Sequence, residues 1–99
     1  MTDKIERTTD HRKEFSDALK ACLVESGIAT AANLHKEMDA RGYPVNDSTV
    51  RLYVSGNVLP PEPAFGIIQS ILEPNITKES MGRLERTYIW QRRTNVGMR

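Results

Sequence analysis

The amino-acid sequence predicts an all-α domain of five helices. Apolar residues recur at three- and four-residue spacing in successive segments, which is the pattern of amphipathic helices. Glycines and prolines separate these segments, at positions where helices end or begin. No pair of segments alternates apolar and polar residues as two paired strands would. The length of 99 residues is that of one domain.

The first two predicted helices follow a short polar start. Residues 1–9 are polar apart from Ile5, and we expect a flexible N-terminus there. A helix over 10–25 has an apolar face that repeats every three to four residues: Phe15, Ala18, Leu19, Cys22 and Leu23. A second helix begins after Thr30, a good N-cap residue, and runs to about Ala40.

The third predicted helix is short and has a clear beginning and end. Asn46, Asp47 and Ser48 can all cap its start with a side-chain oxygen. Gly56 ends it, because glycine tolerates the left-handed conformation that closes a helix. Over 47–55 one face is apolar and the opposite face is polar, so the helix would be anchored on one side only.

Two more helices complete the chain. Pro63 fits the first turn of a fourth helix, and Pro74 stops it. This helix has the most apolar sequence of the five and is expected to be central: Ala64, Phe65, Ile67, Ile68, Ile71 and Leu72. Thr77 caps a fifth helix that runs to about Arg93, with Met81, Leu84 and Tyr88 as its inner stripe.

The composition limits the kinds of function that we expect for this chain. Charged residues make up 27% and hydrophobic residues 38% of the chain, as in ordinary soluble domains. No apolar run approaches a membrane span, and the single cysteine, Cys22, fits a reducing cytoplasm. His11, His35 and Cys22 are scattered, so we expect no metal site and no cofactor. We also find no catalytic constellation and expect no enzyme.

The charge is unevenly distributed, although the net charge is only +1. Residues 1–73 carry 8 Lys and Arg against 11 Asp and Glu, whereas residues 74–99 carry 6 against 2. The C-terminal quarter is therefore basic, which favours contact with phosphates or a solvated tail.

The segment VNDSTVRLYVSG, at 45–56, is followed by a proline turn and an apolar helix. This order resembles the lambda repressor/Cro-like (XRE) helix-turn-helix family. The family's hydrophobic, threonine, aromatic and glycine positions correspond to Val45, Thr49, Tyr53 and Gly56. Two features differ from the family pattern: His35 follows the Leu34 of the second helix, and the link from Leu34 to Val45 is longer.

The resemblance implies a helix-turn-helix DNA-binding domain over 10–73, with a C-terminal basic and aromatic helix and tail over 74–99. It also implies a dimeric repressor of phage or plasmid type that reads double-stranded DNA, with 47–55 in the major groove. Asparagine, serine and arginine side chains can hydrogen bond to base edges or phosphates. The candidate DNA contacts are Thr30, Asn33, Asn46, Asp47, Ser48, Thr49, Arg51, Ser55 and Asn57.

The sequence is also compatible with two alternatives to this interpretation. The long link LHKEMDARGYPVNDSTV also resembles a winged helix, which would place a β-hairpin after the third helix. A protein-interaction module of antitoxin or assembly type would keep the fold without DNA contact, and the near-neutral charge favours it.

The fifth helix carries more apolar surface than one small core requires. Tyr88, Ile89 and Trp90 are consecutive, so they cannot all point into the same core. Aromatic residues dominate the energetics of protein interfaces. We therefore expect a homodimer through this helix, with Tyr88, Ile89 and Trp90 at the interface.

Overall fold

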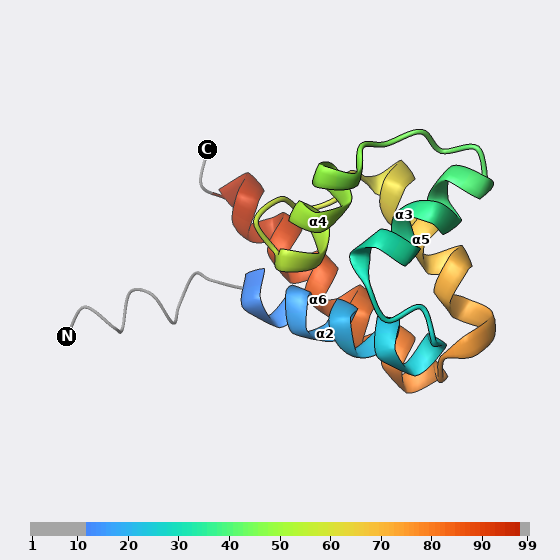
Figure 1. Cartoon of the computed structure of the whole chain (residues 1–99). Coiled ribbons are helices and arrows are strands. Elements are labelled where there is room, and N and C mark those ends of the chain that lie inside the picture. The colour runs from blue at the N-terminus through green and yellow to red at the C-terminus, as the bar shows by residue number, and fades with distance from the viewer. Residues whose placement is uncertain (1–11, 98–99) are drawn as a thin grey trace.

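The computed structural model describes residues 12–97, and these residues form five α-helices and one short 3-10 helix (Figure 1). The helices are α2 (Arg12–Ser26), α3 (Ala31–Ala40), α4 (Asp47–Ser55), α5 (Glu62–Leu72) and α6 (Lys78–Gly97), with η1 (Glu73–Asn75) between the last two. No strand occurs in this part of the chain. The all-α prediction is confirmed. The flexible start predicted for 1–9 and the first residues of the helix predicted for 10–25 lie outside the described residues.

The helix boundaries expected around α3 and α4 are confirmed. Thr30 caps α3, since its Oγ1 accepts a hydrogen bond of 3.1 Å from the Asn33 backbone N–H. Gly56 closes α4 with a φ of 85°, in the left-handed region that favours glycine. α4 spans the residues predicted for it, and the one difference lies in its capping. Asn46 occupies the N-cap position, but its side chain makes no capping hydrogen bond.

The later helices differ from the prediction in detail. Pro63 lies in the first turn of α5, as expected, and Pro74 lies within η1, which follows α5 directly. α6 begins after the N-cap Thr77, whose Oγ1 accepts from the Ser80 N–H at 3.0 Å. It continues to Gly97, beyond the end predicted near Arg93. The prediction stopped early because it followed the inner apolar stripe, which ends before the helix does.

The β-hairpin of the winged-helix alternative is absent from the described residues. After α4 the chain runs through the extended residues 59–61 into α5, where a winged helix would place two strands. Prolines at 60, 61 and 63 lack the N–H group that a strand ladder needs. The finer lambda-repressor-like arrangement stays a prediction.

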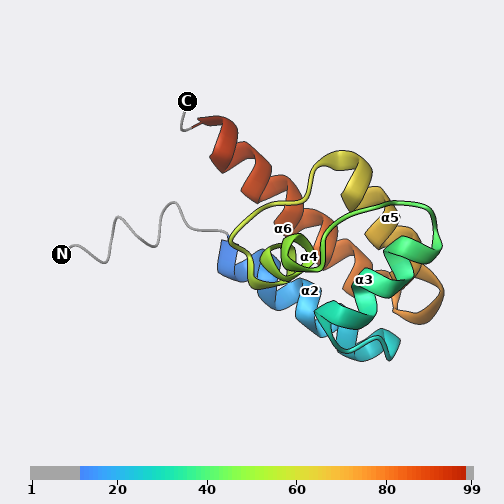
Figure 2. The same cartoon turned by 45° about the horizontal axis from the view of Figure 1, so that its top comes forward.

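The core lies between α2, α5 and α6, and α3 and α4 close it from one side. α2 and α6 pack lengthwise against each other, and both views show them side by side (Figures 1 and 2). Phe15, Phe65 and Tyr88, one from each of these three helices, form an aromatic cluster. The Phe65 and Tyr88 rings stack with their centroids 3.8 Å apart. α4 packs against α3 and α2, so its outer edge remains at the surface.

Candidate nucleic-acid interface

α4 is anchored along one side and exposed along the other. Val50 is fully buried and Tyr53 is 5% exposed, so these residues fix the helix to the core. The opposite edge consists of four exposed side chains: Ser48, Arg51, Leu52 and Ser55. This edge combines hydrogen-bonding groups, one cation and one apolar side chain, which is a suitable set for reading base edges.

Arg51 is paired within its own helix. Its Nη2 lies 3.0 Å from an Asp47 carboxylate oxygen, one turn earlier, and both side chains remain substantially exposed. An exposed pair at this spacing stabilises a helix by only about 0.3–0.5 kcal/mol. The pair therefore orients the guanidinium at the surface without holding it strongly.

Thr30 and Asn33, at the start of α3, have structural roles. The Thr30 hydroxyl accepts the capping hydrogen bond, and the Asn33 side-chain amide donates to the Ile28 carbonyl oxygen at 2.8 Å. Both residues are exposed. They fix the chain reversal before α3, where Ala29 has a positive φ of 70°. Their predicted contact with DNA stays a prediction.

The remaining candidates lie at the two ends of α4. At its start, the Asn46 side chain is exposed, and Thr49 is half-buried one turn into the helix. At its end, the Asn57 side-chain amide donates to Ser55 Oγ at 3.0 Å, and Ser55 Oγ donates to the Leu52 carbonyl oxygen. The exposed Ser55 and Asn57 side chains therefore form one small cluster.

This cluster borders a polar hollow that the sequence analysis did not predict. Residues from α2 and from the end of α4 line it: Lys13, Ser16, Asp17, Lys20, Ser55, Gly56 and Asn57. The Ser16 hydroxyl donates to the Val54 carbonyl oxygen at 2.7 Å, which fixes α2 against α4 at this point. Two lysines, two hydroxyls and an amide thus line one open depression, with Asp17 as its single carboxylate, and the Lys13 ammonium lies 3.6 Å from an Asp17 oxygen in an exposed ion pair. Such a set of donors suits an anion such as a phosphate group.

The sequence contains one feature that points to this hollow. Lys13 and Lys20 are seven residues apart, which places both on one face of α2. What the sequence could not reveal is that this face adjoins the end of α4, more than thirty residues later in the chain.

His35 accounts for the unusual link between α3 and α4. Its Nε2 lies 2.8 Å from the Val45 carbonyl oxygen, so the histidine ties the last part of the link to α3. Here the longer link is fastened by a side chain that can reach it.

The three predicted interface residues of α6 differ in their surroundings. Tyr88 is only 5% exposed and belongs to the aromatic core, so its side chain is not at the surface of this chain. Ile89 is 48% and Trp90 is 42% exposed. Tyr88 points inward because consecutive helix positions point in different directions, and the homodimer interface predicted at Tyr88, Ile89 and Trp90 stays a prediction.

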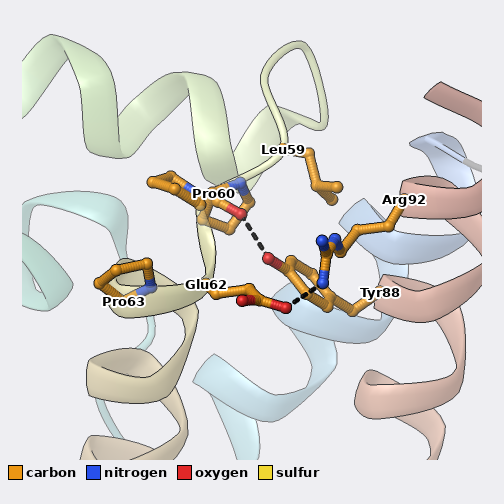
Figure 3. Close-up of a pocket in the computed structure, with 7 residues that line it drawn as sticks. Leu59, Pro60, Glu62, Pro63, Tyr88 and Arg92 are labelled. Atoms are coloured by element: carbon orange, nitrogen blue, oxygen red, sulfur yellow. Dashed lines mark hydrogen bonds and ion pairs between the residues drawn. The ribbon is translucent and has the colours of Figure 1, made fainter. Parts of the chain in front are cut away.

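Tyr88 fastens α6 to the loop that follows α4, and Arg92 fastens it to the start of α5 (Figure 3). The Tyr88 hydroxyl donates to the Pro60 carbonyl oxygen, and Arg92 forms an ion pair with Glu62. The Arg92 guanidinium also lies 6.0 Å from the centre of the Tyr88 ring. These contacts line a small hollow together with Leu59, Pro61 and Pro63, and they set the path of the chain leaving α4.

No group of three or more potential metal ligands occurs among residues 12–97, and no helix there is long and apolar enough to cross a bilayer. The chain matches no model of a known protein family, no curated protein and no solved structure. The resemblance to the helix-turn-helix family therefore depends on the sequence pattern of 45–56 and its flanking helices.

Proposed function

We propose that this chain is a sequence-specific, double-stranded DNA-binding transcriptional regulator, with α4 as the helix that enters the major groove. The observation that carries the proposal is the exposed edge of α4 beside the lysine-lined hollow of α2. An anchored helix with a polar outer edge can reach base edges, and adjacent cations can bind the flanking phosphates.

The size of α4 fits this role. Its 9 residues give a length of about 13 Å. A helix with its side chains is about 10–12 Å across, so α4 can lie within a groove about 12 Å wide. Ser48 and Arg51 can hydrogen bond to base edges, and arginine binds guanine through two parallel hydrogen bonds. The exposed Leu52 can contact a thymine methyl group, which would explain why an apolar side chain lies on this edge.

The pairing of Arg51 with Asp47 does not prevent base contact. A bidentate contact with guanine is worth about 1–3 kcal/mol, whereas the exposed ion pair contributes at most a few tenths. The guanidinium therefore gains free energy when it turns from Asp47 to a base. Asp47 is then left near the groove, where it can accept a hydrogen bond from cytosine N4.

Phosphate contacts would come from α2 and from the C-terminal end of α4. Lys13, Lys20 and the Ser55–Asn57 cluster surround the hollow at the end of the helix. They would hold the sugar-phosphate backbone beside the groove that α4 occupies. A net charge of only +1 is compatible with this, because a few well-placed cations determine the contact.

A dimer with two-fold symmetry would increase the number of base pairs that the protein reads. One helix of this length reads only a few base pairs, which gives little discrimination against a genome. The exposed Ile89 and Trp90 of α6 are the candidate contacts between two copies. The proposed protein is a small dimeric repressor of phage or plasmid type that acts in the cytoplasm.

A protein-interaction module of antitoxin or assembly type is the second candidate. The ion pair between Asp47 and Arg51 favours it, because it neutralises the one cation on the outer edge of α4. In that case α4 would meet a protein surface of mixed polarity, and the lysines of α2 would have no phosphate to bind.

Selection of binding sites from a pool of randomised duplexes, followed by gel-shift titration, separates the two candidates. We expect enrichment of a defined site and specific binding by the wild-type chain. Arg51→Ala should weaken binding to that site by about 1–3 kcal/mol and relax the base preference at one position. Arg41→Ala, at the exposed far end of α3, is the matched control and should bind normally. An absence of any binding at low salt would reject the DNA-binding proposal and favour the interaction module.

A further inference from the structure

The outer face of α6 carries a regular stripe of exposed or half-exposed residues. Leu84, Thr87, Tyr88 and Gln91 are buried against the rest of the bundle. On the opposite side, residues at three- and four-residue spacing form what we term the α6 stripe: Glu79, Gly82, Arg83, Arg86, Ile89, Trp90 and Arg93. The C-terminal half of α6 extends past the ends of the other helices (Figure 2), so this half of the stripe is accessible.

The two ends of the stripe carry opposite charges, with the cations Arg83 and Arg86 between them. Glu79 lies in the first turn of α6, and Arg93 lies four turns later. In a parallel pair of such helices, each of these residues would face its own copy and like charges would repel at both ends. In an antiparallel pair centred on Arg86, each Glu79 faces the Arg93 of the other copy. Charge complementarity therefore selects the antiparallel arrangement.

The same antiparallel register also places side chains of complementary shape opposite each other. With Arg86 at the centre, Trp90 faces Gly82 of the other copy, and Ile89 faces the aliphatic part of Arg83. Gly82 has no side chain and is half-exposed, so it leaves a notch in the stripe that can receive an indole ring. Leaving aside its two chain neighbours and the nearby backbone of α6, only an Arg86 nitrogen among the described residues lies within 4 Å of the Cβ position at Gly82, at 3.5 Å.

This direction of the Arg86 side chain also keeps the two arginine charges apart, which would otherwise lie together at the two-fold axis. Its guanidinium is directed back along α6 towards Gly82, away from the middle of the pair. It would then lie beside the Trp90 ring that enters the notch. A guanidinium against an indole face is a favourable cation–π contact, so Arg86 beside Gly82 would attract the ring.

Resting on the dimer in the proposed function, we propose that two copies pair through antiparallel α6 helices with their two-fold axis at Arg86. In this pair Trp90 fills the notch at Gly82 of the other copy, and Glu79 forms an ion pair with its Arg93. The partner is a second copy of this chain, because one continuous stripe supplies both halves of each contact.

Disulfide cross-linking without DNA tests the register. Arg86→Cys should oxidise to a covalent dimer by itself, because residue 86 meets its own copy at the axis. Glu79→Cys and Arg93→Cys should each fail alone but cross-link when mixed. The wild-type chain is the control, since its Cys22 is buried and should form no covalent dimer. Self-cross-linking of Glu79→Cys, or failure of Arg86→Cys to cross-link, would overturn the antiparallel register.

Reversal of charge gives an independent measurement in sedimentation equilibrium. Glu79→Arg and Arg93→Glu should each raise the dimer dissociation constant by about tenfold, because each creates two repulsive contacts per dimer. The double variant should return close to the wild-type value, and lack of recovery would contradict the pairing of these residues. Gly82→Leu should fill the notch and weaken the dimer, whereas Gly66→Leu, at an exposed position of α5, should not. All of these results are independent of the gel shifts, so a wrong register and a failure to bind DNA are told apart.

Discussion

The hydroxyl of Tyr88 donates a hydrogen bond of 2.7 Å to the carbonyl oxygen of Pro60, 28 residues earlier in the chain. The bond is buried, and it joins α6 to the extended segment between α4 and α5 (Figure 3). Burial raises the pKa of the Tyr88 hydroxyl, so it keeps its proton and its role as donor well into the alkaline range. α6 therefore helps to fix where the chain leaves α4.

Removal of that hydroxyl should destabilise the fold. Tyr88→Phe retains the stacked ring against Phe65 but leaves the buried Pro60 oxygen without its donor, which costs about 1–2 kcal/mol. Thermal denaturation followed by circular dichroism should show a lower Tm. Tyr43→Phe removes a hydroxyl that makes no hydrogen bond among the described residues and should leave the Tm unchanged. Equal effects of the two variants would show that the bond contributes nothing specific.

Acid should weaken the junction between α2 and α6. The Glu25 carboxylate accepts from the Ser80 hydroxyl at 2.6 Å and from the Thr77 N–H at 2.8 Å, and these bonds lower its pKa. A lowered folded-state pKa adds stability above the unfolded-state pKa of about 4.3 and loses it as the pH falls further. Denaturant titrations from pH 6 down to roughly pH 3 should therefore show a smaller loss of stability for Glu25→Gln than for wild type.

The control for that titration is Glu37→Gln, which changes an exposed glutamate of α3 without such hydrogen bonds. Its stability should fall with pH as the wild type's does. If Glu25→Gln also follows the wild type throughout, the carboxylate does not stabilise the start of α6.

The lysines of α2 should determine part of the salt dependence of DNA binding. Each phosphate contact releases counterions, so Lys13→Ala and Lys20→Ala should each reduce the slope of log affinity against log salt by about 1. The loss should be similar on all sequences, since phosphates carry no base identity. Lys36→Ala on α3 is the control. Gel shifts at several salt concentrations measure the slopes, and unchanged slopes would remove the hollow from the interface.

Loss of the exposed aromatic residue of α6 should weaken self-association. Trp90→Ala removes a side chain that is 42% exposed in one copy, so it should shift the protein towards monomer in sedimentation. Its helical signal in circular dichroism should remain. Val24→Ala changes another exposed apolar residue, on α2, and should leave association unchanged. A dimeric Trp90→Ala protein, or a wild type that is monomeric both free and on DNA, would refute the role of α6.

Local residue chemistry was sufficient to predict the helices. Thr30 and Thr77 cap helices with their own hydroxyls, and Gly56 closes α4, because capping depends on residues within one turn. The inward positions of Leu84 and Tyr88 followed from helical periodicity. The sequence also identified the polar edge of α4 as an outer surface, since 47–55 has one apolar face.

Contacts between segments that are far apart in the sequence determined how the helices lie relative to one another. Only the packing of α2 on α4, through Ser16 and the Val54 carbonyl oxygen, brings Lys13 and Lys20 beside the end of the candidate helix. Only the fold leaves Ile89 and Trp90 exposed, at 48% and 42%. Periodicity is a property of one helix, but the neighbours of that helix depend on the burial of apolar surface from the whole chain. The sequence therefore determined the helices and their faces, and the tertiary structure determined which faces meet.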